Sequence, residues 1–137
     1  MTIKQVAALP YRMGFDGRPE VMLITSRSDD RHWLPPKGHL IDGLEPHNAA
    51  AQEAHEEAGV IGEISERPIG AYRAQKIRTN GQSDDLEIAL YPMRFVRREA
   101  DWPEKGQRAI LWFDPQDAAR AVREAGLSRL LSEFRPF

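Results

Sequence analysis

The segment from Pro46 to Gly59 constrains the fold of this chain more than any other stretch of its sequence. It begins with a proline, continues mainly with alanines and glutamates, and ends with a glycine. Because proline is well accepted in the first turn of a helix and glycine readily ends one, the pattern predicts a helix over Pro46 to Ala58. The alanines along one arc are small enough to let this helix lie close to a sheet, and they are Ala50, Ala51, Ala54 and Ala58.

Three glutamates of the predicted helix form a cluster of negative charge. Glu53, Glu56 and Glu57 are spaced so that all three side chains project from one face. Like charges at this spacing destabilise a helix, and no lysine lies between Leu40 and Gly59 to relieve them. An exposed acidic face is the common explanation for such a trio. The other is a divalent cation, because Mg²⁺ prefers oxygen ligands and is often shared between carboxylates and substrate phosphates.

The β-prone runs on both sides of this helix predict a mixed sheet. They cover residues 6–13, 21–26, 69–77, 86–96 and 109–113, with a hairpin turn between the first two. A second helix is expected to begin at Asp114-Pro115, with a break at Gly126 before a last amphipathic turn or two. The polar stretches 78–85 and 97–108 are interpreted as surface loops.

The composition predicts one soluble domain and excludes several partners. A length of 137 residues, 41% of them hydrophobic and 29% charged, fits a single domain over residues 1–137. With 19 Lys and Arg against 21 Asp and Glu, the formal charge is −2, so a nucleic-acid polymer is not an expected partner. The chain has no cysteine, so metal chemistry must use oxygen or imidazole ligands. We expect no membrane span and no signal peptide, and therefore a cytoplasmic location.

The residues in front of the predicted helix decide between an acidic surface and a metal site. The loop Trp33-Leu34-Pro35-Pro36-Lys37-Gly38-His39 leads into it, and residues 38–60 resemble the Nudix box. The box reads Gly, five residues, Glu, seven residues, Arg-Glu, an apolar residue, any residue, Glu-Glu, any residue, Gly and an apolar residue. The register matches without insertion or deletion. Leu44, however, stands where the family has its first glutamate, and Gln52 stands where it has arginine.

The resemblance implies both a fold and a chemistry. The fold is α+β, an α/β/α sandwich with a mixed sheet between helices, which agrees with the strands and helices expected above. Glu53, Glu56 and Glu57 match the family's metal ligands and are the implied catalytic residues, with the carbonyl of Gly38 assisting and Mg²⁺ as the implied ion, Mn²⁺ being an alternative. Glu53 is the first candidate to accept a proton from the attacking water, and Glu87 and Glu104 remain alternatives.

Segments outside the box are similar to one branch of this family. They are Thr25-Ser26-Arg27, residues 33–38, Trp102-Pro103-Glu104, Arg108 and Trp112-Phe113, and they resemble enzymes that hydrolyse diphosphoinositol polyphosphates and diadenosine polyphosphates. The resemblance therefore implies a small polyphosphate as substrate. Arg27, Lys37 and His39 are the candidate substrate-binding residues. Arg31, Arg73, Lys76, Arg78 and Arg108 are further cations that the fold would have to gather around one cleft. The oligomeric state is left open, with a homodimer as one option.

Two other functions stay open on the sequence. A Nudix-like module that binds a nucleotide without catalysis is favoured by Leu44 and Gln52, whereas the three retained glutamates argue against it. A nucleic-acid processing role is disfavoured by the charge balance. If the family's glutamate and arginine form a partly buried pair, joint replacement by Leu44 and Gln52 avoids a stranded charge, and we expect the two positions to be energetically coupled.

Overall fold

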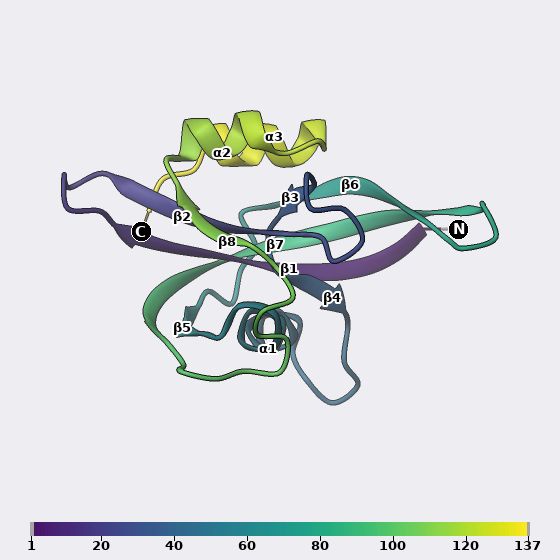
Figure 1. Cartoon of the computed structure of the whole chain (residues 1–137), viewed down its shortest axis with the longest axis horizontal. Helices are drawn as coiled ribbons and strands as arrows, with labels where there is room; N and C mark the ends of the chain where they lie inside the picture. The colour runs from purple at the N-terminus through teal and green to yellow at the C-terminus, as the bar shows by residue number, and fades with distance from the viewer. Residues whose placement is uncertain (1, 137) are drawn as a thin grey trace.

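The computed structural model describes residues 2–136, which form one mixed sheet between two layers of helix (Figure 1). Helix α1 (Pro46–Ala58) covers one face. Helices α2 (Pro115–Ala121) and α3 (Ala125–Ser132) cover the other face. This arrangement confirms the expected α/β/α sandwich. None of the helices in the described part of the chain is long and apolar enough to cross a membrane.

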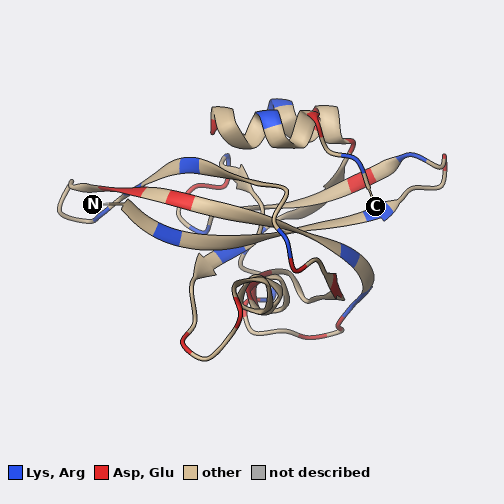
Figure 2. Cartoon of the chain, turned by 180° about the vertical axis from the view of Figure 1, so that it is seen from behind, with Lys and Arg blue, Asp and Glu red and all other residues tan. Residues whose placement is uncertain are grey.

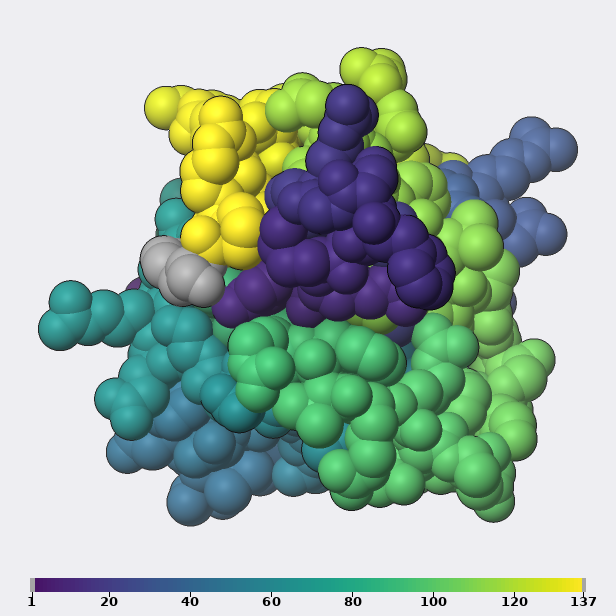
Figure 3. Space-filling model, turned by 90° about the vertical axis from the view of Figure 1, so that its left-hand side faces the viewer, coloured from purple at the N-terminus to yellow at the C-terminus, as the bar shows by residue number. Residues whose placement is uncertain are grey.

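The sheet is organised around two long central strands. Its strands are β1 (Thr2–Met13), β2 (Pro19–Thr25), β3 (Trp33–Leu34), β4 (Lys37–His39), β5 (Val60–Ile64), β6 (Gly70–Ile77), β7 (Ser83–Arg98) and β8 (Ile110–Phe113). Strands β1 and β7 run parallel to each other, and the other strand pairs of the described residues are antiparallel. The turn between β1 and β2 projects at one end of the molecule, where the C-terminal segment lies beside it (Figure 3).

Strand β1 pairs with two different strands along the same edge. Its last residues pair with the start of β2, whereas Gln5, Val6 and Ala7 pair with β4. The chain crosses between the two partners after β3, where the amide of Ala8 donates to the carbonyl of Pro36 at 2.9 Å. This split in the sheet holds Lys37 and Gly38 at the edge of β1, next to α1.

Each face of the sheet has its own apolar core. Leu9, Leu23 and Leu90 pack against Leu127 and Leu131 of α3. On the opposite face, Val6, Met22 and Val60 pack against the buried alanines of α1, which are Ala49, Ala50, Ala54 and Ala58. The alanines have no exposed surface, and their small size brings the helix backbone close to the strands.

Some sequence-based expectations about elements were wrong. Strands β3, β4 and β5 were not expected, because they are short and β5 follows directly on the glycine cap of α1. Strand β7 reaches from Ser83 to Arg98, so both polar stretches interpreted as loops contribute residues to it. The predicted second helix breaks at Val122, which is extended and forms a bridge with Trp33, whereas Gly126 lies inside α3.

Candidate active site

Helix α1 presents Glu53, Glu56 and Glu57, which we call the carboxylate ledge. The helix begins at Pro46 after an extended Glu45 and ends at Gly59, whose φ of 71° is readily adopted only by glycine. The acidic residues of α1 and of the loop before it lie below the sheet (Figure 2). Both ends of the helix are thus placed by residue types that the sequence shows directly.

Glu57 is the innermost carboxylate of the ledge. It is only 7% exposed, and its Oε1 accepts a hydrogen bond from the backbone amide of Lys37 at 3.2 Å. The guanidinium of Arg108 lies 3.7 Å from its Oε2. Burial raises the pKa of Glu57 to about 8, although the charge of Arg108 acts in the opposite direction. Burial thus makes the charged form of this carboxyl costly, and additional positive charge beside it would favour the carboxylate.

Glu53 lies directly over Gly38 of β4. A Cβ atom added at Gly38 would stand 2.1 Å from the Oε1 atom of Glu53, so only glycine leaves room for this side chain. Burial and then the charge of Glu56 raise the pKa of Glu53. The structure thus brings together the glycine and the first of the three glutamates that the resemblance assigned to one metal site.

Glu56 connects the ledge to a loop that is distant in sequence. Its side chain accepts a hydrogen bond from Gln52 at 3.0 Å, and its backbone carbonyl accepts one from the amide of Glu104 at 3.0 Å. The carboxylate of Glu104 in turn lies 3.1 Å from Arg108 and 3.8 Å from Arg27. Glu104, one of the alternative bases, therefore lies beside the ledge.

The ledge is not a closed metal cage in this conformation. Among residues 2–136, no three histidine or acidic side chains converge closely enough to enclose an ion by themselves. Glu56 turns to Gln52, and Glu57 lies beside Arg108. Mg²⁺ keeps several waters and needs only one or two carboxylates together with substrate phosphates. The all-oxygen ledge with its excess negative charge fits that kind of ion.

The predicted cationic residues fall into separate groups. Arg108 is almost buried and joins Glu57, Glu104 and the carbonyl of Thr25, to which it donates at 3.0 Å. Arg27 lies near it, whereas the ammonium of Lys37 donates to Gln5 at 2.9 Å. His39 is exposed on β4, and Arg31 is exposed in the loop before β3.

The remaining cations lie on the β6–β7 hairpin and not on the ledge. Arg78 forms a bidentate pair with Asp84. Arg73 and Lys4 lie within 4.0 Å of Glu87, the other alternative base, which is thus engaged on the sheet surface. Sequence reasoning gave Arg108 no more weight than these residues, and only its burial singles it out. It gave Thr25 no role of its own, although the hydroxyl of Thr25 accepts from the amide of Ala109 at 2.9 Å and fixes the approach of the Arg108 loop.

The two departures from the box do not form a buried pair. Leu44 is 40% exposed in the loop before α1, and Gln52 is exposed on the helix. Gln52 instead donates to Glu56 within the same helix. The premise that a single charge at either position would be stranded in a partly buried place is therefore wrong for this chain.

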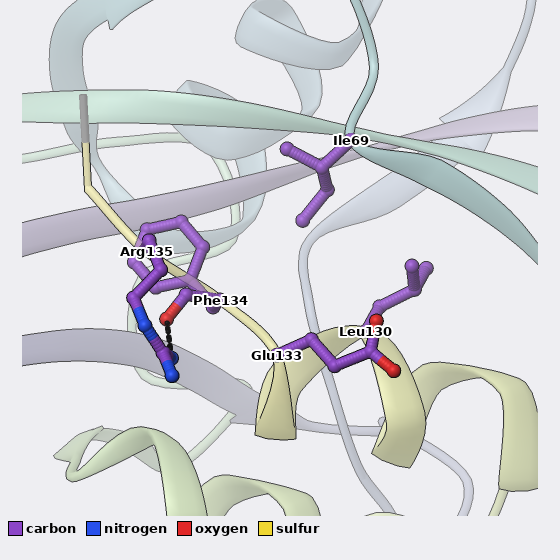
Figure 4. A pocket seen from close by; sticks show the side chains of 5 residues that line it. All are labelled: Ile69, Leu130, Glu133, Phe134 and Arg135. Carbon is purple, nitrogen blue, oxygen red and sulfur yellow. Dashed lines mark hydrogen bonds between the residues drawn. The ribbon is translucent and has the colours of Figure 1, made fainter.

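A pocket of about 230 Å³ lies elsewhere, beside the C-terminal segment (Figure 4). It is lined by Ile69, Leu130, Glu133, Phe134 and Arg135, and the guanidinium of Arg135 donates to the carbonyl of Phe134 at 2.9 Å. Leu130 packs on the core under α2 and α3, on the other face of the sheet from the ledge. This pocket is separate from the carboxylate chemistry.

A family model for the NUDIX domain matches residues 3–134. The chain belongs to this family. The Nudix membership confirms the resemblance that the box residues carried. One relative, Nudix hydrolase 12, mitochondrial, of Arabidopsis thaliana, is 30% identical over 124 residues, which are 88% of this chain and 60% of the relative. Diphosphoinositol polyphosphate phosphohydrolase 3-beta of Homo sapiens is 27% identical over 122 residues, covering 88% of this chain and 69% of that protein.

Solved structures show the same Nudix fold. The C. elegans Ap4A hydrolase has a TM-score of 0.65 at 22% identity, covering 96% of this chain and 95% of that one. A NUDIX hydrolase from Nitrosomonas europaea has a TM-score of 0.68 at 18% identity, covering 96% and 87%. The named relatives are hydrolases, which agrees with the enzyme class expected from the sequence. The chain spans between 60% and 70% of the length of the first curated relatives.

Proposed function

We propose that this protein hydrolyses a phosphoanhydride bond in a small polyphosphate, with Mg²⁺ or Mn²⁺ bound at the carboxylate ledge. The substrate classes are dinucleoside polyphosphates and diphosphoinositol polyphosphates, the compounds named for two relatives. The observation that carries the proposal is the convergence of Glu57, Glu53 and Gly38 at the β4 edge, with too little positive charge to balance the carboxylates.

A divalent ion at this ledge would withdraw charge from the phosphate oxygens and lower the pKa of a coordinated water. The protein's own part is positioning. Helix α1 is rigidly packed through its alanines, and the Lys37 amide orients the carboxylate of Glu57. Arg108 holds Glu57 and Glu104 from one side. Pre-positioned groups of this kind lower the barrier without reorganising during the reaction.

Glu53 is the first candidate to accept the proton of the attacking water. It is half-buried and lies against the glycine backbone, and it is not paired with a cation at hydrogen-bond distance. Glu104 is the alternative base, but Arg108 donates two hydrogen bonds to its Oε1, which makes it a weaker proton acceptor. Comparison of Glu53→Gln with Glu104→Gln at saturating metal separates the two: the base variant loses turnover at every metal concentration.

The test is a metal-dependent assay with identified products. We expect diadenosine tetraphosphate or a diphosphoinositol pentakisphosphate to be cleaved with Mg²⁺, and AMP to remain intact under the same conditions, since a phosphomonoester lacks a stable anhydride leaving group. Cleavage of the monoester at a comparable rate would contradict the proposal. Binding without any cleavage of either anhydride would instead favour the non-catalytic Nudix-like module.

A further inference from the structure

The turn between β1 and β2 carries an exposed aromatic side chain at one end of the sheet (Figure 1). Phe15 is fully exposed, and within residues 2–136 it is the only aromatic among the exposed large hydrophobic side chains. Met13, at the start of the turn, is more than half exposed. Single exposed apolar residues are common on protein surfaces. The role of Phe15 therefore depends on how the turn holds it and on what lies beside it.

Hydrogen bonds hold Phe15 in a fixed outward position. The amide of Gly14 donates to the carbonyl of Arg18 at 2.7 Å, and the amide of Gly17 donates to the carbonyl of Gly14 at 3.0 Å. The carboxylate of Asp16 accepts from the amide of Arg18 at 2.9 Å. Because the turn is already ordered, binding through Phe15 costs little conformational entropy.

A pocket with apolar walls lies beside the C-terminal segment. It is the pocket of about 230 Å³ in Figure 4, and we call it the terminal pocket. Ile69, Leu130 and Phe134 form its apolar part, and the exposed residues Glu133 and Arg135 complete it. Pockets for small molecules usually measure about 300–1,000 Å³. The terminal pocket is smaller and suits a single large side chain.

The turn and the terminal pocket lie side by side at the same end of the molecule. The ring of Phe134 is 5.4 Å from the ring of Tyr11, so a wall of the pocket packs against the strand that leads into the turn. Figure 3 shows the C-terminal segment beside the turn. A protruding group next to a pocket can be self-complementary, because two copies related by a twofold axis can each insert into the other.

The charges beside Phe15 and in the terminal pocket are complementary. Asp16 and Arg18 follow Phe15 in the turn, and Glu133 and Arg135 lie at the pocket. If the two segments meet in opposite directions, Asp16 faces Arg135 and Arg18 faces Glu133. The present ion pair between Asp16 and Arg18 is exposed. Exposed pairs contribute little to stability, so both side chains can take partners from a second copy.

We propose that this chain forms a symmetric dimer in which Phe15 of each copy enters the terminal pocket of the other. A buried aromatic side chain removes about 150–250 Å² from water. Two of them, with the pocket walls that they cover, approach the lower limit of about 1,200 Å² for a specific interface. The dimer is therefore weak and exchanges with monomer at micromolar concentrations. It uses no residue of the carboxylate ledge, so the inference is independent of the proposed hydrolysis.

Sedimentation velocity of the whole chain, from low micromolar to near millimolar concentration, tests this dimer. We expect a dimer that grows with concentration, and Phe15→Ser should raise its dissociation constant by more than about a hundredfold, because the anchor is lost twice. Ile77→Ser is the matched control. It removes an exposed apolar side chain at the β6–β7 turn, at the other end of the sheet (Figure 1), and should leave the dimer unchanged. Thermal unfolding verifies that each variant is folded.

Exchanging two charges tests the identity of the partner. Arg18→Glu alone and Glu133→Arg alone each place like charges together twice in the dimer, and each should weaken it about tenfold. The variant with both changes should recover most of the affinity, since the pair is restored with the charges exchanged. A double variant no better than the single ones overturns the proposal, as does a dimer that persists in Phe15→Ser. A protein that stays monomeric throughout also overturns it and leaves the terminal pocket to another occupant.

Discussion

The guanidinium of Arg108 lies 3.7 Å from the carboxylate of Glu57, and the two side chains are only 8% and 9% exposed. Loss of Arg108 would leave the buried carboxylate of Glu57 without a nearby cation, whereas loss of Glu57 leaves Arg108 its ion pair with Glu104. The cation comes from the loop before β8 and the anion from α1, so the pair also connects two distant parts of the chain.

Replacing Arg108 with glutamine should therefore destabilise the metal-free protein. We expect a loss of about 1–3 kcal/mol in the free energy of unfolding, at the lower end because Glu57 can take up a proton. Added Mg²⁺ should restore part of the loss, since the ion supplies the missing positive charge. Urea unfolding with EDTA and with Mg²⁺ measures both effects. Arg120→Gln, which removes an exposed ion pair with Asp117, is the control and should change little.

Glu56→Gln and Glu57→Gln should each remove most of the turnover while the protein stays folded. Each change deletes one charge of the carboxylate ledge, the proposed metal site, and preserves the length of the side chain. For Glu57→Gln we also expect equal or higher stability without metal, since a buried carboxylate is replaced by a neutral amide. Steady-state rates at limiting Mg²⁺ and thermal unfolding in EDTA are the measurements. Near-normal rates in both variants would show that the ledge is not the metal site. The control is Glu63→Gln, on the exposed part of β5, which should keep the normal rate.

Gly38→Ala should displace Glu53. The added methyl group would overlap the carboxylate, so the side chain must turn away or β4 must shift, at a cost of about 1–3 kcal/mol. We expect weaker Mg²⁺ binding in calorimetry as well as lower turnover. His39→Ala on the same strand changes an exposed side chain and should leave the metal affinity intact. Equal affinities in both variants would mean that Glu53 does not contact the ion.

Gln52→Arg should be almost neutral for folding, within about 0.5 kcal/mol, because both the residue and its bond to Glu56 are exposed. The restored positive charge should compete with Mg²⁺ at the ledge and raise the metal concentration needed for half-maximal binding. Leu44→Glu alone should also be tolerated. A double-mutant cycle in unfolding free energy then gives additive effects, whereas strong coupling between the two positions would restore the paired model expected from the sequence.

The hydrogen bond between His32 and Glu124 makes the stability of the folded protein depend on pH. Burial alone would raise the pKa of Glu124, but the hydrogen bond to His32 and further contacts outweigh it, and the pKa lies below its ordinary value of 4.5. A carboxyl with a depressed pKa contributes stability above its unfolded pKa and loses it as the pH falls through its folded pKa. The stability difference between the unmodified protein and Glu124→Gln should therefore shrink below about pH 4.5. A difference that stays constant from pH 7 to pH 3 would contradict this assignment.

The sequence by itself determined α1, the ledge and the layered fold. Pro46, Gly59 and the alanine arc act through local backbone preferences and helical spacing, and these do not depend on distant residues. The box register likewise predicted that Gly38 lies close to the glutamates, and the structure has Gly38 directly against Glu53.

Only the tertiary structure decided which of the many cations contacts the carboxylate ledge and which other distant side chains pair. Arg108 reaches Glu57 because Thr25 and Ala109 bring β2 and the loop before β8 together, a contact between residues more than eighty positions apart. The hydrogen bond between His32 and Glu124 follows the break at Val122, where pairing with Trp33 overrides helix preference. Such contacts arise from burial and sheet pairing between distant segments, which local sequence patterns do not encode.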